Sequence, residues 1–340
     1  GLQRIVSKAE IQVDASPTAT PRKRLRFFRL QKELLPRFLS SPHGVMLTGA
    51  SVTELMVDRD GRVTGATAKT LDGTTKIARA RFYVVACGGL ETPRLLLLSR
   101  SDAFPAGIGN TYDRVGRGFN EHPGVNFYST IRHSRETIRP RHRLGRSHQT
   151  YEDFRKDGLG SVLPVFIQSW VFPNHLLKPH LDDIPRVASA LVRRTIRPEL
   201  YVGATIEMRP QDENRLTLSP DARDQFGNPR GHLHLDFSED DRRTLDRARE
   251  LILGILARLG ATAVREGEQT WSRHHIGTCR MGTNPATSVA DATLRVHGCP
   301  NLYLSGSETF VTGSALPPVL TIVALEHRLS EHMIERLRNG

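Results

Sequence analysis

The sequence has few cysteines and no long apolar run. Cys87, Cys279 and Cys299 are scattered through 340 residues, and no C-x-x-C pair occurs. This count and spacing disfavour both a zinc site and a disulfide framework, so we expect no metal. No apolar stretch reaches the length that a bilayer requires, so we also expect no membrane span. Internal repeats and low-complexity segments are absent, and 38% hydrophobic residues suit one large core or two fused ones.

Acidic residues are too few to balance the basic ones. Lys and Arg number 48 and Asp and Glu 36, which gives a formal net charge of +12. Such an excess can attract nucleic acid, anionic membrane or acidic partners. The basic residues are dispersed, however, without interleaved aromatics or a nucleic-acid-binding motif. We therefore interpret the charge as an arginine-rich solvated surface and expect no nucleic-acid partner.

Residues 45–86 show the composition and turn chemistry of β-strands. The ranges 45–57, 62–69 and 75–86 are rich in Val, Thr and Ile, and Asp-Gly-type turns separate them. They predict a three-stranded antiparallel meander. The end of the last range, Phe82 to Ala86, is an apolar run typical of a strand buried on both faces.

A glycine turn and a helix start follow this run. Cys87-Gly88-Gly89 precedes Glu91, from which we predict a helix through Leu98. Such a junction lets a ligand approach the backbone closely. Many α/β proteins turn this way without a ligand, so the turn alone is weak evidence of a site.

The middle of the chain predicts further strands and one long helix. Strands are expected at 206–208, 215–218 and 232–237, with a long turn at 220–230. Ser238 to Asp241 resembles a capping box, after which apolar residues recur at helical spacing up to Gly260. We interpret this helix either as a wall of a substrate domain or as core packing alone.

Two adjacent histidines are candidate catalysts. His274 and His275 lie in a Gly-rich loop, and histidine is the usual general acid or base near neutral pH. They are equally consistent with structural histidines. A metal site is disfavoured, because no carboxylate or thiolate cluster with ligand spacing lies nearby.

A second candidate segment follows at residues 289–318. It combines a short buried strand, the small-residue turn Ser305-Gly306-Ser307 and a helix start at Pro317-Pro318. The N-terminus of a helix carries partial positive charge and would stabilise a negatively charged ligand. By itself the pattern favours an ordinary strand-to-helix connection.

Taken together, these segments resemble the glucose–methanol–choline (GMC) family of FAD-dependent oxidoreductases. The resemblance rests on residues 84–96, on G-R-G-F-N-E-H-P at 116–123, on residues 207–219, and on H-x-x-G-T-x-R-M-G from His274. It implies an α/β fold, with an FAD/NAD(P)-binding-type domain in residues 1–120 and 270–340. An antiparallel-sheet α+β substrate domain in residues 121–269 would be interleaved with it.

The resemblance implies oxidation of a CH–OH group on an alcohol or sugar-like substrate, with hydride passing to flavin N5. His274 takes the position that faces flavin and substrate, where it would be the general base, and FAD supplies the redox chemistry. His275 is the second candidate. An electron-acceptor protein or a quinone is a candidate partner, and we favour a dehydrogenase over an oxidase as a hypothesis.

The resemblance also implies eight FAD-contacting positions: Val52, Ala86, Cys87, Gly88, Ser305, Gly306, Pro318 and Val319. The first would touch adenine with its backbone, and the next three would line the dinucleotide. The Ser-Gly pair would lie near the flavin, and the last two would begin a helix aimed at the pyrimidine ring.

Two departures from the family pattern bear on function. No G-x-G-x-x-G loop is found, so we expect the N-terminal βαβ unit to be missing and FAD affinity to be poor. The chain would be a fragment or half of a split protein. Pro317 takes the position of a His or Asn that partners the catalytic His, and proline has no side-chain donor or acceptor. Either His275 substitutes, or His274 acts alone, or the chain is a catalytically impaired homologue with a binding or scaffold role.

Overall fold

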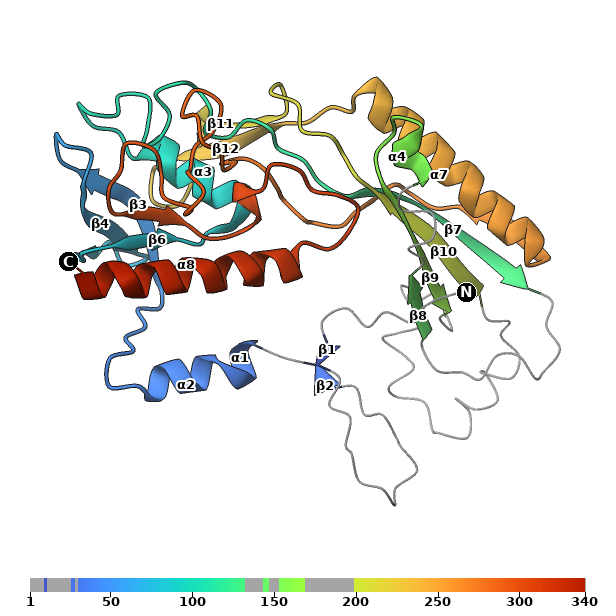
Figure 1. Cartoon of the computed structure of the whole chain (residues 1–340), viewed down its shortest axis with the longest axis horizontal. Coiled ribbons are helices and arrows are strands. Elements are labelled where there is room, and N and C mark those ends of the chain that lie inside the picture. The colour runs from blue at the N-terminus through green and yellow to red at the C-terminus, as the bar shows by residue number, and fades with distance from the viewer. Residues whose placement is uncertain are drawn as a thin grey trace, which may run out of the picture.

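The computed structural model describes residues 9–10, 26–27, 30–131, 143–146, 153–168 and 199–339. Four short elements lie near the start: β1 (Ala9–Glu10) pairs with β2 (Arg26–Phe27), and α1 (Leu30–Glu33) precedes α2 (Leu35–Ser40). The remaining elements form two groups, each around its own hydrophobic core (Figure 1).

The first group contains the expected antiparallel meander. It consists of β3 (Ala50–Val57), β4 (Val63–Thr70) and β5 (Thr75–Ala78), in that order. The Asp58 carboxylate shapes the first turn by accepting hydrogen bonds from the backbone N–H groups of Asp60 (3.0 Å) and Arg62 (2.8 Å). Gly61 completes this turn with a φ of 77°, a conformation that favours glycine. The meander prediction is confirmed.

The predicted third strand, 75–86, is wrong as one element. The chain leaves the meander after Ala78, and β6 (Tyr83–Val85) pairs in parallel with the distant β15 (Leu302–Leu304). The strand is not buried on both faces either, because Val84 is 47% exposed while Tyr83 is 8% exposed. Strand propensity could not show that the chain changes sheets.

One buried side chain joins the two sheets. Asn301 Nδ2 donates to the backbone oxygens of Val63 (2.8 Å) and Arg81 (3.1 Å), and its Oδ1 accepts from Val63 N (2.9 Å). A fully buried amide with its hydrogen-bonding groups satisfied specifies one arrangement of the strands around it.

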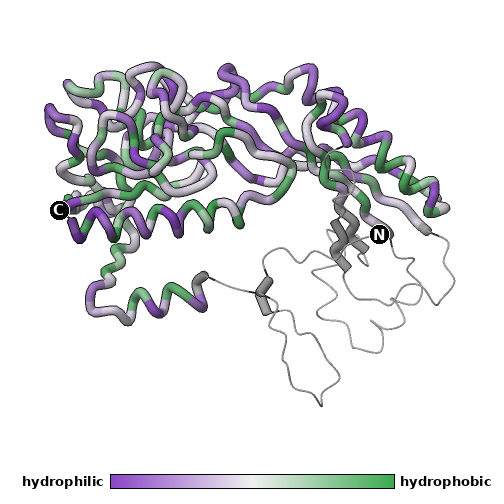
Figure 2. Tube along the Cα trace, in the orientation of Figure 1, coloured by the Kyte–Doolittle hydropathy of each residue, from purple (hydrophilic) through white to green (hydrophobic). Residues whose placement is uncertain are grey.

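Two helices complete this first group. α3 (Gly88–Leu98) begins at Gly88, three residues before the predicted start, and it buries Leu95 and Leu96 in the core. α8 (Val319–Asn339) follows Pro318, as predicted, and Leu329 packs with the buried Tyr303 of β15. Figure 2 shows hydrophobic and hydrophilic residues alternating along α8, as expected of a helix that covers a sheet on one side.

The second group is an antiparallel sheet with a long helix beside it. Its strands run in the order β13-β7-β10-β9-β8, with β14 also paired to β7. Their bounds are β7 (Pro123–Ile131), β8 (Arg143–Arg146), β9 (Val162–Gln168), β10 (Glu199–Ile206), β13 (Ala261–Glu266) and β14 (Thr270–Trp271). The strand predicted at 206–208 instead ends at Ile206.

α7 (Glu239–Arg258) packs on this sheet, and the short α4 (Asp153–Lys156) adds Phe154 to the core. The predicted capping box is confirmed. Ser238 Oγ accepts from Asp241 N (3.0 Å), and Asp241 Oδ2 accepts from Ser238 N (3.0 Å). Leu245, Ala248 and Ile252 are buried on the face toward the sheet, which is the helical periodicity seen in the sequence.

A hairpin within the middle of the chain packs with the first group. β11 (Arg215–Arg223) and β12 (Pro229–His234) lie against α3, where Arg94 Nε donates to Pro229 O (2.8 Å). Leu216 belongs to the first core. The turn predicted at 220–230 is shorter than expected, because strand pairing extends to Arg223 and Pro229. The domain ranges therefore stay a prediction, and the hairpin from within residues 121–269 lies against α3 of the first group.

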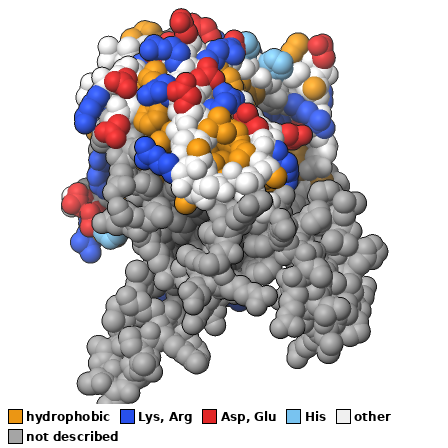
Figure 3. Space-filling view, turned by 90° about the vertical axis from the view of Figure 1, so that its right-hand side faces the viewer, with side chains coloured by type: hydrophobic (Ala, Val, Ile, Leu, Met, Phe, Trp, Pro, Cys, Tyr) orange, Lys and Arg blue, Asp and Glu red, His pale blue; other side chains and the backbone are white. Residues whose placement is uncertain are grey.

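The surface at the α7 end of the molecule carries both signs of charge. Figure 3 shows basic and acidic side chains interleaved there, with hydrophobic side chains gathered between them. On α7, Arg247 pairs with Glu250, and Arg249 pairs with both Asp246 and Glu266. Among the described residues, no helix has the length and hydrophobicity needed to cross a bilayer.

Candidate functional site

Three segments far apart in the sequence lie side by side at the candidate site. Asn120 and Ile276 exchange backbone hydrogen bonds of 3.0 Å in both directions. On the other side of residues 276–281, Cys279 N donates to Glu308 O (2.8 Å) and Met281 N donates to Thr309 O (2.8 Å). The loop that follows His274 is therefore held between residues 116–122 and the 3₁₀ helix η1 (Ser307–Thr309).

His274 contacts a second histidine that sequence reasoning did not identify as a site residue. Its Nδ1 lies 2.9 Å from Nδ1 of His122, and the two rings meet edge to face with centroids 5.0 Å apart. The backbone N–H of His274 donates to Glu121 Oε1. The stretch 116–123 resembles a family segment in the sequence, but nothing in its spacing indicated which side chain contacts His122.

His122 is buried and has a strongly lowered pKa. Only 1% of the residue is exposed. Burial, followed by the proximity of His274, lowers its pKa from 6.5 to about 4. Its Nε2 lies 3.2 Å from the carbonyl oxygen of Gly313. At neutral pH the ring is therefore uncharged.

The segment that follows Gly313 is anchored to the antiparallel sheet. Ala315 N donates to Ser161 Oγ (3.0 Å), and Thr205 Oγ1 donates to Ala315 O (3.2 Å). A Cβ at position 313 would lie 2.7 Å from Asn120 Oδ1 and 3.2 Å from His122 Nε2, so glycine allows this close approach. Pro317 follows this anchored segment and offers no polar side chain.

His275 lies differently from His274. Its ring packs beside Phe119, with centroids 5.8 Å apart, and its backbone oxygen accepts from Ser307 Oγ (2.8 Å). The ring that contacts His274 is thus that of His122. A catalytic role for His275 stays a prediction.

The expected FAD-contacting turns adjoin this loop. Ser305 N donates to Val85 O (2.9 Å), which places the Ser305-Gly306 turn beside the end of β6. Thr278 Oγ1 donates to Gly89 O (2.8 Å) at the start of α3. Gly306 has a φ of 149°, in the region that favours glycine. The structure therefore brings the histidine loop, the start of α3 and the 305–307 turn together.

The residues present suit a dinucleotide carrying a flavin ring. Exposed apolar side chains occur at Val52 (44% exposed), Val84 (47%) and Leu320 (82%), and Cys87, three residues after Val84, is also exposed. α3 and α8 begin at Gly88 and Val319, where backbone N–H groups carry partial positive charge. An apolar ring system and an anionic diphosphate are the ligand groups that match these features. Among the described residues, no group of three His, Cys, Asp or Glu side chains gathers at metal-binding distance.

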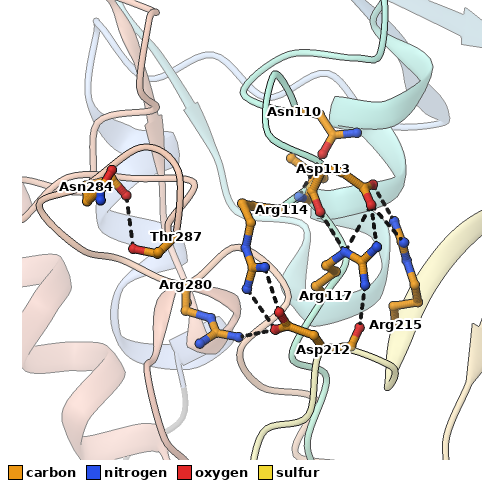
Figure 4. A network of polar contacts seen from close by, with 10 residues as sticks. Asn110, Asp113, Arg114, Arg117, Asp212, Arg215, Arg280, Asn284 and Thr287 are labelled. Carbon is orange, nitrogen blue, oxygen red and sulfur yellow. Dashed lines mark hydrogen bonds and ion pairs between the residues drawn. The ribbon is translucent and has the colours of Figure 1, made fainter.

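A network of arginines and aspartates connects residues 113–117, Asp212, Arg215 and Arg280 (Figure 4). Asp212 accepts from Arg114 through both oxygens (2.7 Å each) and from Arg280 (3.0 Å). Asp113 accepts from Arg215 (2.7 Å) and from Arg117, and these partners lower its pKa to about 2. The network links the G-R-G-F stretch, the H-x-x-G-T-x-R loop and β11, so we assign these arginines to structure.

Replacing Asp212 with alanine is expected to destabilise the full-length protein by about 1–3 kcal/mol, because Arg114 and Arg280 lose a charge-assisted acceptor. Urea unfolding monitored by circular dichroism measures the change. Asp221→Ala, at an exposed position of β11, is the matched control and should leave the midpoint nearly unchanged. Equal midpoints for both variants would contradict a structural role for the network.

Comparison with known proteins agrees with this architecture. The family models for GMC oxidoreductases match residues 26–124 and 210–325, which together make up more than half of the chain. The chain belongs to the GMC oxidoreductase family. GMC oxidoreductases are FAD-binding flavoproteins, so the resemblance, the fold class and the cofactor expected from the sequence are confirmed.

This GMC chain is similar to enzymes that act on sugars and sugar derivatives. It is 27% identical over 306 residues to the fructose dehydrogenase large subunit of Gluconobacter japonicus, covering 87% of this chain and 55% of the relative. It is 30% identical over 315 residues to 6'''-hydroxyparomomycin C oxidase of Streptomyces lividus, covering 87% and 53%. The chain thus spans about half the length of the curated relatives it matches.

Solved structures show the same fold. Pyridoxine 4-oxidase from Mesorbium loti superposes with a TM-score of 0.59 at 18% identity, over 85% of this chain and 58% of that one. A formate oxidase gives a TM-score of 0.60 at 16% identity, over 88% and 62%. The individual site residues and the missing N-terminal loop stay predictions.

Proposed function

We propose that the protein oxidises a CH–OH group of an alcohol or sugar-like substrate, with His274 as general base. The observation that carries the proposal is the position of His274. Its half-buried ring contacts the buried His122 and stands in the loop that adjoins the start of α3 and the 305–307 turn. A base held beside a flavin site is what removal of a hydroxyl proton requires.

Residues of this chain would hold FAD at that site. Ala86, Cys87 and Gly88 would line the dinucleotide, and the Ser305-Gly306 turn would approach the flavin. Val52 would contact adenine, while Pro318 and Val319 lie at the start of α8, where the partial positive charge of the helix N-terminus favours an anionic ring. Bound there, FAD would supply the acceptor for the hydride that leaves the substrate carbon. The chain itself positions the hydroxyl and takes its proton on His274.

The relatives suggest the substrate class. Their names include a fructose dehydrogenase, a hydroxyparomomycin oxidase and a 2-methyl-1,2-propanediol dehydrogenase. A polyhydroxylated small molecule, oxidised at one primary or secondary carbon, fits this range. We propose that electrons leave through a protein or quinone acceptor, in keeping with the dehydrogenases among the relatives.

Pro317 supports a second candidate, a homologue with impaired catalysis that binds its ligand without turnover. The side chain of proline provides neither a hydrogen-bond donor nor an acceptor. The two candidates differ in whether the FAD-loaded protein reduces an artificial acceptor when substrate is added.

The experiment is a dye-reduction assay on the FAD-loaded, full-length protein with a panel of sugars, aminosugars and diols. We expect at least one compound to drive dye reduction and to accumulate as its carbonyl product. The corresponding deoxy compound, which lacks only the reacting hydroxyl, is the matched control and should be inert. A protein that holds FAD but reduces dye with none of the panel would favour the impaired homologue.

A further inference from the structure

The contacts of His122 determine where its own proton lies. Nε2 is 3.2 Å from the Gly313 carbonyl oxygen, and a carbonyl oxygen only accepts hydrogen bonds. Nε2 of His122 must therefore carry the proton. Because the buried ring is neutral, its other nitrogen, Nδ1, carries a lone pair and accepts.

This assignment fixes the proton on the neighbouring ring. Nδ1 of His274 lies 2.9 Å from Nδ1 of His122, a normal hydrogen-bond distance. Since His122 Nδ1 accepts, His274 Nδ1 must donate. A neutral His274 then carries its proton on Nδ1 and its lone pair on Nε2.

We propose that His122 is a positioning residue that holds His274 in the Nδ1–H tautomer, so that Nε2 is the atom that takes the substrate proton. When that proton arrives, both nitrogens of His274 are protonated, and the bond from Nδ1 to His122 becomes charge-assisted and stronger. The inference rests on the proposed function, because it assigns a partner to the base named there. His122 would thus be the hydrogen-bonding partner of His274, a role that the side chain of Pro317 cannot fill.

The surroundings of His122 make it a rigid acceptor. Its carbonyl partner belongs to the segment that Ser161 and Thr205 anchor through Ala315. The other charges that act on the ring are His274 itself and the Glu207 carboxylate, while Glu121 precedes it in the chain and binds the His274 backbone. Glu207 is occupied by Ser161, whose N–H and hydroxyl both donate to Glu207 Oε2 (3.0 and 2.8 Å).

The test compares His122→Leu with His122→Asn in the FAD-loaded, full-length protein. Leucine fills much of the space but cannot accept, whereas the asparagine amide oxygen can take the place of Nδ1. We expect His122→Leu to slow substrate-driven flavin reduction by about 10- to 100-fold, and its acid limb of kcat/KM should move to lower pH. His122→Asn should retain most of the rate and the wild-type pH profile. Equal loss in both variants, or none in His122→Leu, would overturn the proposal.

A second measurement reads the tautomer directly and needs no variant of His122 to fold. ¹⁵N NMR of histidine-labelled wild-type protein distinguishes a protonated from an unprotonated ring nitrogen, and the signals missing in His274→Gln belong to His274. We expect the neutral ring of His274 to carry its proton on Nδ1 and to leave Nε2 unprotonated. The reverse tautomer would overturn the inference while leaving His274 as a base. If His274→Gln itself reduces flavin at the wild-type rate, the proposed function fails instead.

Discussion

Replacing His274 with glutamine is expected to lower the rate of flavin reduction by substrate by about 10²- to 10⁴-fold, the usual contribution of a positioned general base. Glutamine keeps a hydrogen-bonding side chain of similar reach but cannot take the hydroxyl proton at neutral pH. Because the backbone contacts of this loop run to Glu121, Asn120 and Ser307, the fold should persist. Stopped-flow absorbance under anaerobic conditions measures the rate.

His275→Gln is the matched control for this experiment. The ring of His275 packs beside Phe119, while that of His274 contacts His122. We therefore expect His275→Gln to change the rate by less than about tenfold. A larger loss in His275→Gln than in His274→Gln would move the catalytic role to the second histidine. FAD content, read from the visible spectrum, should match wild type in both variants.

Replacing Glu308 with glutamine is expected to stabilise the protein at alkaline pH. Glu308 is fully buried, and among the described residues its Oε2 has no hydrogen-bond partner. Its Oε1 accepts a long bond from Thr92 Oγ1 (3.4 Å). Burial raises the pKa of this carboxyl from 4.5 to about 7.

The raised pKa sets the direction of the pH dependence. Between pH 4.5 and 7 the folded state keeps a proton that the unfolded state has lost, so the stabilising contribution falls as pH rises. Above pH 7 the loss amounts to roughly 3.5 kcal/mol, because each pKa unit corresponds to about 1.4 kcal/mol. Glu308→Gln removes this titration. Its free energy of unfolding should therefore exceed that of wild type at pH 8 and approach it near pH 4.5.

Urea unfolding at pH 5 and pH 8, at a fixed FAD concentration, checks this expectation. Glu54→Gln, at an exposed position of β3, removes a carboxyl without burial and should show the wild-type difference between the two pH values. If Glu308→Gln also shows the wild-type difference, the buried carboxyl does not control the alkaline limb of stability.

Local sequence signals predicted those elements whose stability is itself local. The meander followed from its Asp-Gly-type turns, and α7 from the Ser238–Asp241 capping box and its apolar periodicity. The pairing of β6 with β15 could not be predicted in this way, because it joins residues more than two hundred positions apart. The exposure of Val84 could not be predicted either, because it depends on how a sheet of two distant strands is packed.

The candidate site was predictable in part. His274 and the 305–307 turn stood out as Gly-rich, polar segments, and the structure places them together. His122 did not stand out, because its partner lies 152 positions away and a single histidine before a proline has no helical or metal-binding spacing. Only its tertiary contacts, with His274 and with the Gly313 carbonyl oxygen, identify His122 as a candidate site residue.

The most direct test of the central claim is the visible absorption spectrum of the full-length protein, recorded anaerobically before and after addition of sugars and diols. We expect an oxidised-flavin band that bleaches with at least one CH–OH substrate and returns when an electron acceptor is added. A protein that shows no flavin band after purification with excess FAD would contradict the claim.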